Sequence, residues 1–90
     1  MLVIPDNFPS VNQIYSCILE LIDESSGEIS NREFETFVIA RLALPQNLVE
    51  FIHAGNRTEL NYRLAWARTK ASKKGLIKKS NPGVWAVIKA

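Results

Sequence analysis

Residues 56–89, with the sequence NRTELNYRLAWARTKASKKGLIKKSNPGVWAVIK, decide the fold of this 90-residue chain. They predict one long basic helix over residues 57–74. Asn56 suits the N-cap of this helix, because Glu59 follows three residues later and completes a capping box. Gly75 suits the position just beyond the helix, where a positive φ costs glycine little.

Two short strands are predicted after the helix, at residues 76–79 and 84–88. The cluster Ser80-Asn81-Pro82-Gly83 between them is typical of a turn, so the two strands form a hairpin. Apolar residues occupy both faces of the second strand, which predicts one face against the helices and Trp85 over a sheet edge. A long helix, a glycine and a basic hairpin are together typical of the second half of a winged-helix DNA-binding domain.

Charge is unevenly distributed between the two halves of the chain. Residues 57–90 hold nine basic residues and one acidic residue, a formal charge of +8, whereas residues 1–56 hold two basic and eight acidic residues, a charge of −6. The net charge of +2 therefore hides a strongly basic C-terminal half, which indicates a protein that binds a polyanion. No stretch resembles a signal peptide or reaches the ~20 apolar residues of a membrane span, so we expect a cytoplasmic protein with no membrane partner.

The first half of the chain predicts an arm followed by four shorter elements. Pro5 and Pro9 disfavour helix at the residues before them, which predicts an extended arm over residues 1–9, ahead of one domain over residues 10–90. Capping boxes mark the start of a first helix, at Ser10 and Gln13, and of a second helix over residues 31–42, at Ser30 and Glu33. A very short strand is predicted between them at Glu28-Ile29. Pro45 marks the start of a short helix that ends at residues 53–55.

The single histidine and the single cysteine both have structural interpretations. His53 falls in the last turn of the predicted short helix, where it would interact favourably with the helix dipole. Cys17 falls on the apolar face of the first helix, which predicts a buried thiol, and one cysteine excludes an internal disulfide.

A helical wheel divides the long helix into a core stripe, two flanks and an outer face. Because Trp66 lies far from the core stripe, packing against the arm, another domain or a dimer mate is favoured over contact with DNA. The core stripe is Leu60, Leu64, Ala67 and Ala71; the opposite face is Tyr62, Trp66, Thr69 and Lys73; and the flanks are Arg63, Lys70 and Lys74 on one side and Asn61, Arg68 and Ser72 on the other.

Three runs of residues carry a resemblance to a known family. They are residues 63–69 (RLAWART), residues 73–77 (KKGLI) and residues 82–85 (PGVW). In these runs the chain closely resembles the N-terminal domain of Mrr-type restriction proteins. The resemblance implies a winged helix placed ahead of a nuclease domain that cuts modified DNA, and therefore DNA binding rather than cleavage for this chain.

No catalytic motif stands out in the sequence. A restriction-type nuclease holds Mg²⁺ with an Asp and a Glu-x-Lys or Asp-x-Lys pair, and none of the nine acidic residues here has a Lys two positions later. The chain also lacks a Gly-rich phosphate loop and a nucleophile elbow. We therefore expect no enzymatic activity, no metal and no cofactor in this chain, with any nuclease domain lying in a longer parent protein.

The sequence thus predicts a mostly helical α+β winged helix-turn-helix, with three main helices, one extra short helix and a C-terminal hairpin as the wing. Its predicted partner is double-stranded DNA, with a nuclease domain or a homodimer mate as further partners; the alternative is a winged helix that binds only protein. Asn61 suits adenine and Arg63 suits guanine at base edges. Phosphate contacts are predicted for Arg57, Lys70, Lys73, Lys74, Lys78 and Lys79, with Asn81 at the wing tip.

Overall fold

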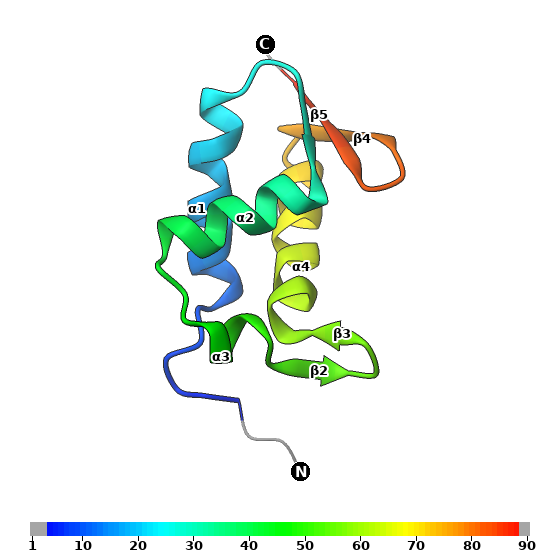
Figure 1. Ribbon diagram of the computed structural model, residues 1–90. Coiled ribbons are helices and arrows are strands. Elements are labelled where there is room, and N and C mark those ends of the chain that lie inside the picture. The colour runs from blue at the N-terminus through cyan, green and yellow to red at the C-terminus, as the bar shows by residue number, and fades with distance from the viewer. Residues whose placement is uncertain (1–3, 89–90) are drawn as a thin grey trace.

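Four helices and two small antiparallel sheets form the described part of the chain, residues 4–88 of a computed structural model (Figure 1). The predicted α+β class is confirmed, with about half of the residues in helices. The first three residues of the predicted arm and the last two of the predicted domain lie outside the described residues. In chain order the elements are α1 (Val11–Glu24), β1 (Glu28–Ser30), α2 (Asn31–Arg41), α3 (Gln46–Val49), β2 (Ile52–Ala54), β3 (Arg57–Thr58), α4 (Glu59–Lys73), β4 (Ile77–Asn81) and β5 (Val84–Val87).

The two long helices, α1 and α4, lie side by side, and α2 crosses in front of them in the view of Figure 1. Their facing stripes supply most of the core, because apolar residues recur at helical spacing on each. None of the four helices has the length and apolar run that a membrane span needs within residues 4–88. The core contains Phe8, Ile14, Cys17, Ile18, Ile22, Ile29, Phe34, Val38, Leu48, Leu60, Leu64, Ala67, Ala71 and Ile77.

Two predicted capping boxes are confirmed. The hydroxyl of Ser10 accepts from the backbone N–H of Gln13, and the Gln13 side chain accepts from the backbone N–H of Ser10. Ser30 and Glu33 repeat the arrangement at the start of α2. Each box satisfies two N–H groups that the first turn of a helix leaves without partners, which fixes where the helix begins.

The predicted start of the long helix is wrong by two residues. The N-cap is Thr58, whose hydroxyl accepts from the backbone N–H of Asn61, and α4 begins at Glu59. Asn56 instead lies in the turn of a hairpin formed by β2 and β3, with Gly55 at φ 56°. Because β2 and β3 pair on either side of this turn, Asn56 cannot adopt a position at the start of the helix. The predicted exit is confirmed, since Gly75 follows the helix with φ 78°.

The short helix is also shorter than predicted. α3 ends at Val49, and His53 lies on β2 rather than in a last helical turn. The predicted dipole role of His53 is therefore wrong, and its ring instead bonds a carboxylate on α4. The β2–β3 hairpin stands at the N-terminal end of α4, next to α3 (Figure 1).

The three-stranded sheet has the order β1-β5-β4 and lies at the C-terminal end of α4. The predicted strand at Glu28-Ile29 is confirmed as β1, which pairs with β5. Trp85 does not cover an edge as predicted, because β5 is the central strand; its indole N–H donates to Oδ1 of Asn31 at the start of α2, 2.8 Å away. This bond ties the hairpin to α2.

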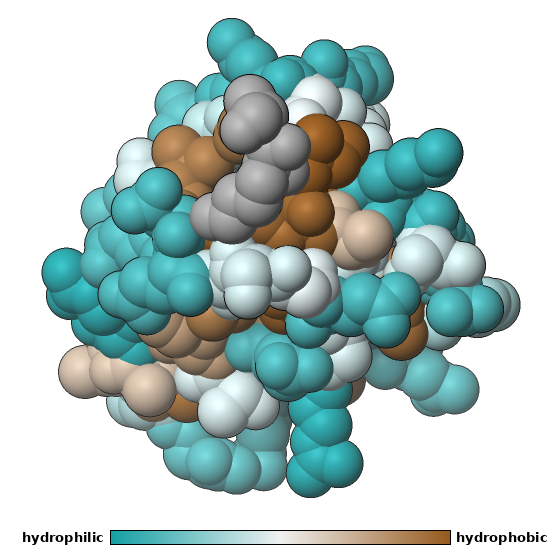
Figure 2. Space-filling view, turned by 90° about the horizontal axis from the view of Figure 1, so that it is seen from above, coloured by the Kyte–Doolittle hydropathy of each residue, from teal (hydrophilic) through white to brown (hydrophobic). Residues whose placement is uncertain are grey.

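An apolar patch lies at the end of the molecule nearest the sheet. Figure 2, which looks down on this end, shows apolar side chains gathered there among hydrophilic ones. They surround a hollow of about 520 Å³ between the last turns of α1 and the sheet. The apolar residues lining it are Leu19, Ile22, Leu76, Val87 and Ile88.

Candidate nucleic-acid interface

The core stripe predicted on α4 is confirmed, and it fixes which face of the helix is free. Leu60, Leu64, Ala67 and Ala71 are fully buried against the other helices. The opposite face therefore points to solvent, because residues half a turn away cannot reach the core. This face, with its flanking residue Lys70, is called the outer face of α4 below; it comprises Tyr62, Trp66, Thr69, Lys70 and Lys73.

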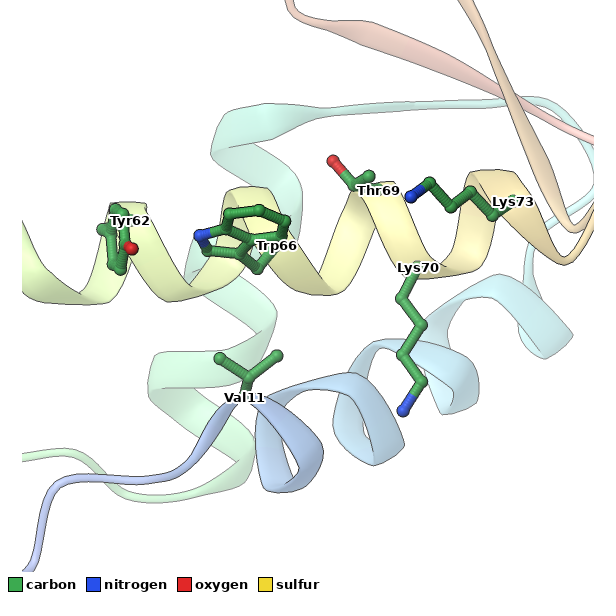
Figure 3. Close-up of a pocket in the computed structure, with 6 residues that line it drawn as sticks. All are labelled: Val11, Tyr62, Trp66, Thr69, Lys70 and Lys73. Carbon is green, nitrogen blue, oxygen red and sulfur yellow. The ribbon is translucent and has the colours of Figure 1, made fainter.

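The outer face borders a groove between α4 and the start of α1 (Figure 3). The groove has a volume of about 450 Å³, and Val11 lies on its α1 side. Trp66 projects from α4 over it with 53 % of its surface exposed. The predicted packing of Trp66 against the arm is not found in the described residues; a dimer mate or a second domain remains an untested prediction.

An aromatic row leads from the β2–β3 hairpin along the outer face. His53 stacks on Tyr62 with 4.0 Å between ring centroids and 11° between planes. Tyr62 in turn meets Trp66 edge to face at 6.5 Å. The guanidinium carbon of Arg57 lies 5.5 Å from the Tyr62 centroid, a cation–π distance. Sequence reasoning missed this row, because it placed His53 on a helix.

Lys70 and Lys73 bring positive charge to the rim of the groove. The Lys70 ammonium lies 4.5 Å from the Tyr15 ring and donates to Oδ1 of Asn12 at 3.2 Å, so its stem lies across α1. Lys73 is exposed one turn further along, and Lys74 follows it at the helix end. Aromatic side chains beside cations are typical of surfaces that bind single-stranded nucleic acid, and lysines alone can hold the phosphates of a duplex.

Arg63 occupies a different environment from the one its sequence position predicts. Its Nε donates to Oε2 of Glu59 at 2.6 Å, and its Nη1 donates to the carbonyl oxygen of Pro9 at 2.8 Å. Its guanidinium also lies 4.8 Å from the Phe8 ring centroid. With donors committed to the arm and to its own helix, Arg63 is poorly placed to bond guanine, and we do not retain it among the base contacts.

Glu59 is the centre of this network and is only 3 % exposed. Its other oxygen lies 2.6 Å from Nδ1 of His53, and Nδ1 must donate because an ionised carboxylate only accepts. Burial alone would raise the pKa of Glu59, but the hydrogen bonds from Arg63 and then His53 outweigh burial and hold this pKa below its usual range. One carboxylate thus joins α4, β2 and the residues before α1.

The remaining predicted contact residues lie on two further parts of the surface. Asn61 is half-buried in the first turn of α4. Lys78 and Lys79 are exposed on β4, and Asn81 is exposed where that strand meets the turn, after a bulge. The predicted lysines are therefore exposed along α4, at its C-terminal end and on β4, and Arg57 is exposed on β3. Arg63 also lies on α4, but its guanidinium is bonded to Glu59 and Pro9. Within residues 4–88, acidic, histidine and cysteine side chains form no cluster of three that could hold a metal ion.

Comparison with known proteins supports the resemblance seen in the sequence. The family model described as the Mrr N-terminal domain matches residues 12–89, which is nearly the whole chain. No curated protein and no solved structure matches this chain. The matched residues include all three runs that carry the resemblance, which are residues 63–69, 73–77 and 82–85. The chain therefore belongs to the Mrr N-terminal domain family, which associates it with restriction systems.

Proposed function

We propose that the chain is a winged-helix domain that binds double-stranded DNA, with α4 as the recognition helix and the β4–β5 hairpin as the wing. Support comes from the element order, in which a strand between two helices pairs with the hairpin after the third main helix. A helix of 15 residues extends about 22 Å, and the major groove of B-DNA is wide enough to admit one.

The observation that carries this proposal is the series of exposed lysines on the outer face of α4, at its C-terminal end and on β4. Its lysines follow one another along the helix, around its C-terminal end and onto β4, while the opposite stripe of α4 is fully buried. In the proposed complex this surface contacts phosphates. The residues assigned to phosphates are Arg57, Lys70, Lys73, Lys74, Lys78 and Lys79.

Base contacts are assigned to the outer face and the first turn of α4. Asn61 keeps the predicted role toward adenine, because only its backbone is used in capping. Trp66 and Thr69 are new candidates, since both are exposed between the two sets of cations. An exposed apolar side chain can contact the methyl group of thymine in the major groove.

We further propose that the domain targets DNA and does not cut it. The support is the absence from the sequence of the Glu-x-Lys or Asp-x-Lys pair that a restriction-type nuclease uses for Mg²⁺. In this proposal cleavage would be supplied by a nuclease domain, as the family resemblance implies.

The test is the salt dependence of binding to a labelled 20-base-pair duplex, followed by fluorescence anisotropy. If about six phosphates are neutralised, log affinity falls against log salt with a slope near −5, and affinity falls about a thousandfold between 50 and 200 mM salt. Affinity that does not change over this range contradicts the proposal.

A second candidate function is protein interaction, and the exposed Trp66 over an apolar groove favours it. In that case the groove binds a second copy or another domain. Absence of DNA binding at 50 mM salt, together with a solution mass at twice 10.1 kDa, would favour this function over DNA binding.

A further inference from the structure

Trp66 is the most exposed large apolar side chain among residues 4–88, with 53 % of its surface open to solvent. A single exposed apolar residue is ordinary on a protein surface. This one differs because its indole lies over the groove between α4 and the start of α1 (Figure 3). A ligand that covers the indole would remove its apolar surface from water, which is favourable.

The indole is held from the side of the β2–β3 hairpin. Tyr62 meets Trp66 edge to face, with 6.5 Å between ring centroids and 80° between planes. Tyr62 is itself stacked on His53 at 4.0 Å, and His53 is bonded to the buried carboxylate of Glu59 at 2.6 Å. A chain of contacts that begins in the protein interior therefore positions the indole, while residues 4–88 leave about half of its surface uncovered.

The groove beside the indole has room for a planar ring. Its volume is about 450 Å³, roughly fifteen times the 30 Å³ share of one water molecule in the liquid. Val11 presents an apolar side chain from α1, and Trp66 lies on the α4 side. A flat ligand in the groove would therefore meet apolar surface from two elements.

Two lysines give the groove a charge that suits an anionic ligand. Lys70 and Lys73 line it, and the described residues that line it include no acid. The Lys70 ammonium donates to Asn12 at 3.2 Å, but an ammonium has three donors, so it can also bond a phosphate. A second copy is a poor occupant, since a symmetric contact would bring the lysines of both copies together, and like charges repel. The groove instead suits an apolar ring carried on an anionic backbone.

We propose that the groove binds one unpaired nucleobase of DNA, which stacks on the indole of Trp66 while Lys70 and Lys73 hold the phosphates beside it. A base inside an intact duplex exposes only its edges, because its neighbours cover both of its faces. Only a base outside the stack can therefore lie flat against the indole. Such stacking accepts any base, because every base has a π-face. The inference rests on the proposed function in that the same lysines hold phosphates in both.

The first experiment compares labelled 20-base-pair duplexes by fluorescence anisotropy at 100 mM salt. One duplex is fully paired, and the other carries one extra, unpaired thymine at its centre. The wild type should bind the bulged duplex roughly 5- to 100-fold more tightly, which is the range expected for one base–aromatic stack. A third duplex, with an abasic residue in the bulge, keeps the extra backbone unit but lacks the base. It should bind no more tightly than the paired duplex.

Three variants test whether the preference for the bulge depends on the indole. Trp66→Ala should lose the preference, whereas Trp66→Phe should keep part of it, because a phenyl ring also stacks. Ile88→Ala is the matched control, since Ile88 is 46 % exposed and lines a different hollow, next to the sheet. This control should keep the full preference. Thermal unfolding should change little in all three, because each alters an exposed residue.

Three results would overturn the site: equal affinity of the wild type for the bulged and paired duplexes, an equal preference for the abasic bulge, or a preference that survives in Trp66→Ala. A wild type that binds the paired duplex without favouring the bulge contradicts this site alone. A Trp66-dependent affinity for the bulged duplex, with no binding of the paired duplex at 50 mM salt, contradicts the proposed function alone. Binding of neither duplex contradicts both, and leaves the groove to a protein partner.

Discussion

Replacing Glu59 by glutamine is expected to destabilise the domain by about 3 kcal/mol, which corresponds to a fall in Tm of more than about 10 °C for a domain of this size. The substitution keeps the shape of the side chain and removes its charge. Arg63 and His53 bond different oxygens of the carboxylate, each at 2.6 Å, and an amide replaces one of these two acceptors with an NH₂ donor. Thermal and urea unfolding at pH 7 measure the effect.

The loss is expected to be large because Glu59 joins three segments of the chain. Its backbone N–H donates to the carbonyl of Phe51, and Phe51 packs edge to face on Phe8. Arg63, oriented by Glu59, holds the carbonyl of Pro9. Removing the carboxylate therefore loosens the residues before α1 and the β2–β3 hairpin together.

Glu24 provides a matched control for this substitution. It is exposed at the end of α1, and Glu24→Gln makes the same change in charge and size. We expect its effect to stay within about 0.5 kcal/mol, as for most surface substitutions. Equal effects of the two substitutions would show that the Glu59 network adds nothing beyond the loss of one negative charge.

The same network predicts how stability depends on pH. The pKa of Glu59 is lowered in the folded protein, so the stabilisation is complete above its unfolded pKa of about 4.3 and is lost as the pH falls through the folded pKa. The difference in unfolding free energy between the wild type and Glu59→Gln should therefore shrink below about pH 4. A difference that stays constant down to pH 3 contradicts an ionised Glu59.

Elements with strong local signals could be predicted from the sequence. The capping boxes at Ser10 and Ser30, the core stripe of α4 and the exit at Gly75 all depend on neighbouring residues, and all are present. The β2–β3 hairpin was missed because its strands are only three and two residues long. Gly55-Asn56 was the signal that could have revealed it, since this pair is typical of a two-residue hairpin turn.

The environments of single arginines were harder to predict than the helices that carry them. Glu59 and Arg63 are four residues apart on one helix, so their ion pair could have been anticipated. The bond from Arg63 to Pro9 spans 54 residues and depends on how the arm packs. Arg68 is likewise buried, although its helical position alone placed it on a flank away from the core stripe. Local pattern identifies a flank of the helix, and tertiary packing decides whether that flank meets solvent.

Reversing the charge of both groove lysines, in Lys70→Glu/Lys73→Glu, is expected to weaken duplex binding by roughly 100-fold or more at 100 mM salt. Two phosphate contacts are lost and two repulsive charges replace them, so the salt slope should fall from about −5 to about −3.5. Both side chains are exposed, so stability should change little. Anisotropy titrations at several salt concentrations measure affinity and slope together.

The control must separate a defined surface from a general effect of net charge. Arg32→Glu/Arg41→Glu makes the same change in net charge on exposed residues of α2, where Arg41 pairs with the exposed Glu20 at 3.0 Å. If the outer face of α4 binds DNA, the control should lose less than about tenfold, because long-range charge is largely screened beyond about 10 Å at this ionic strength. Equal losses of affinity in the two double variants would indicate that duplex binding depends on net charge alone. That result would contradict the proposed role of α4 as the recognition helix.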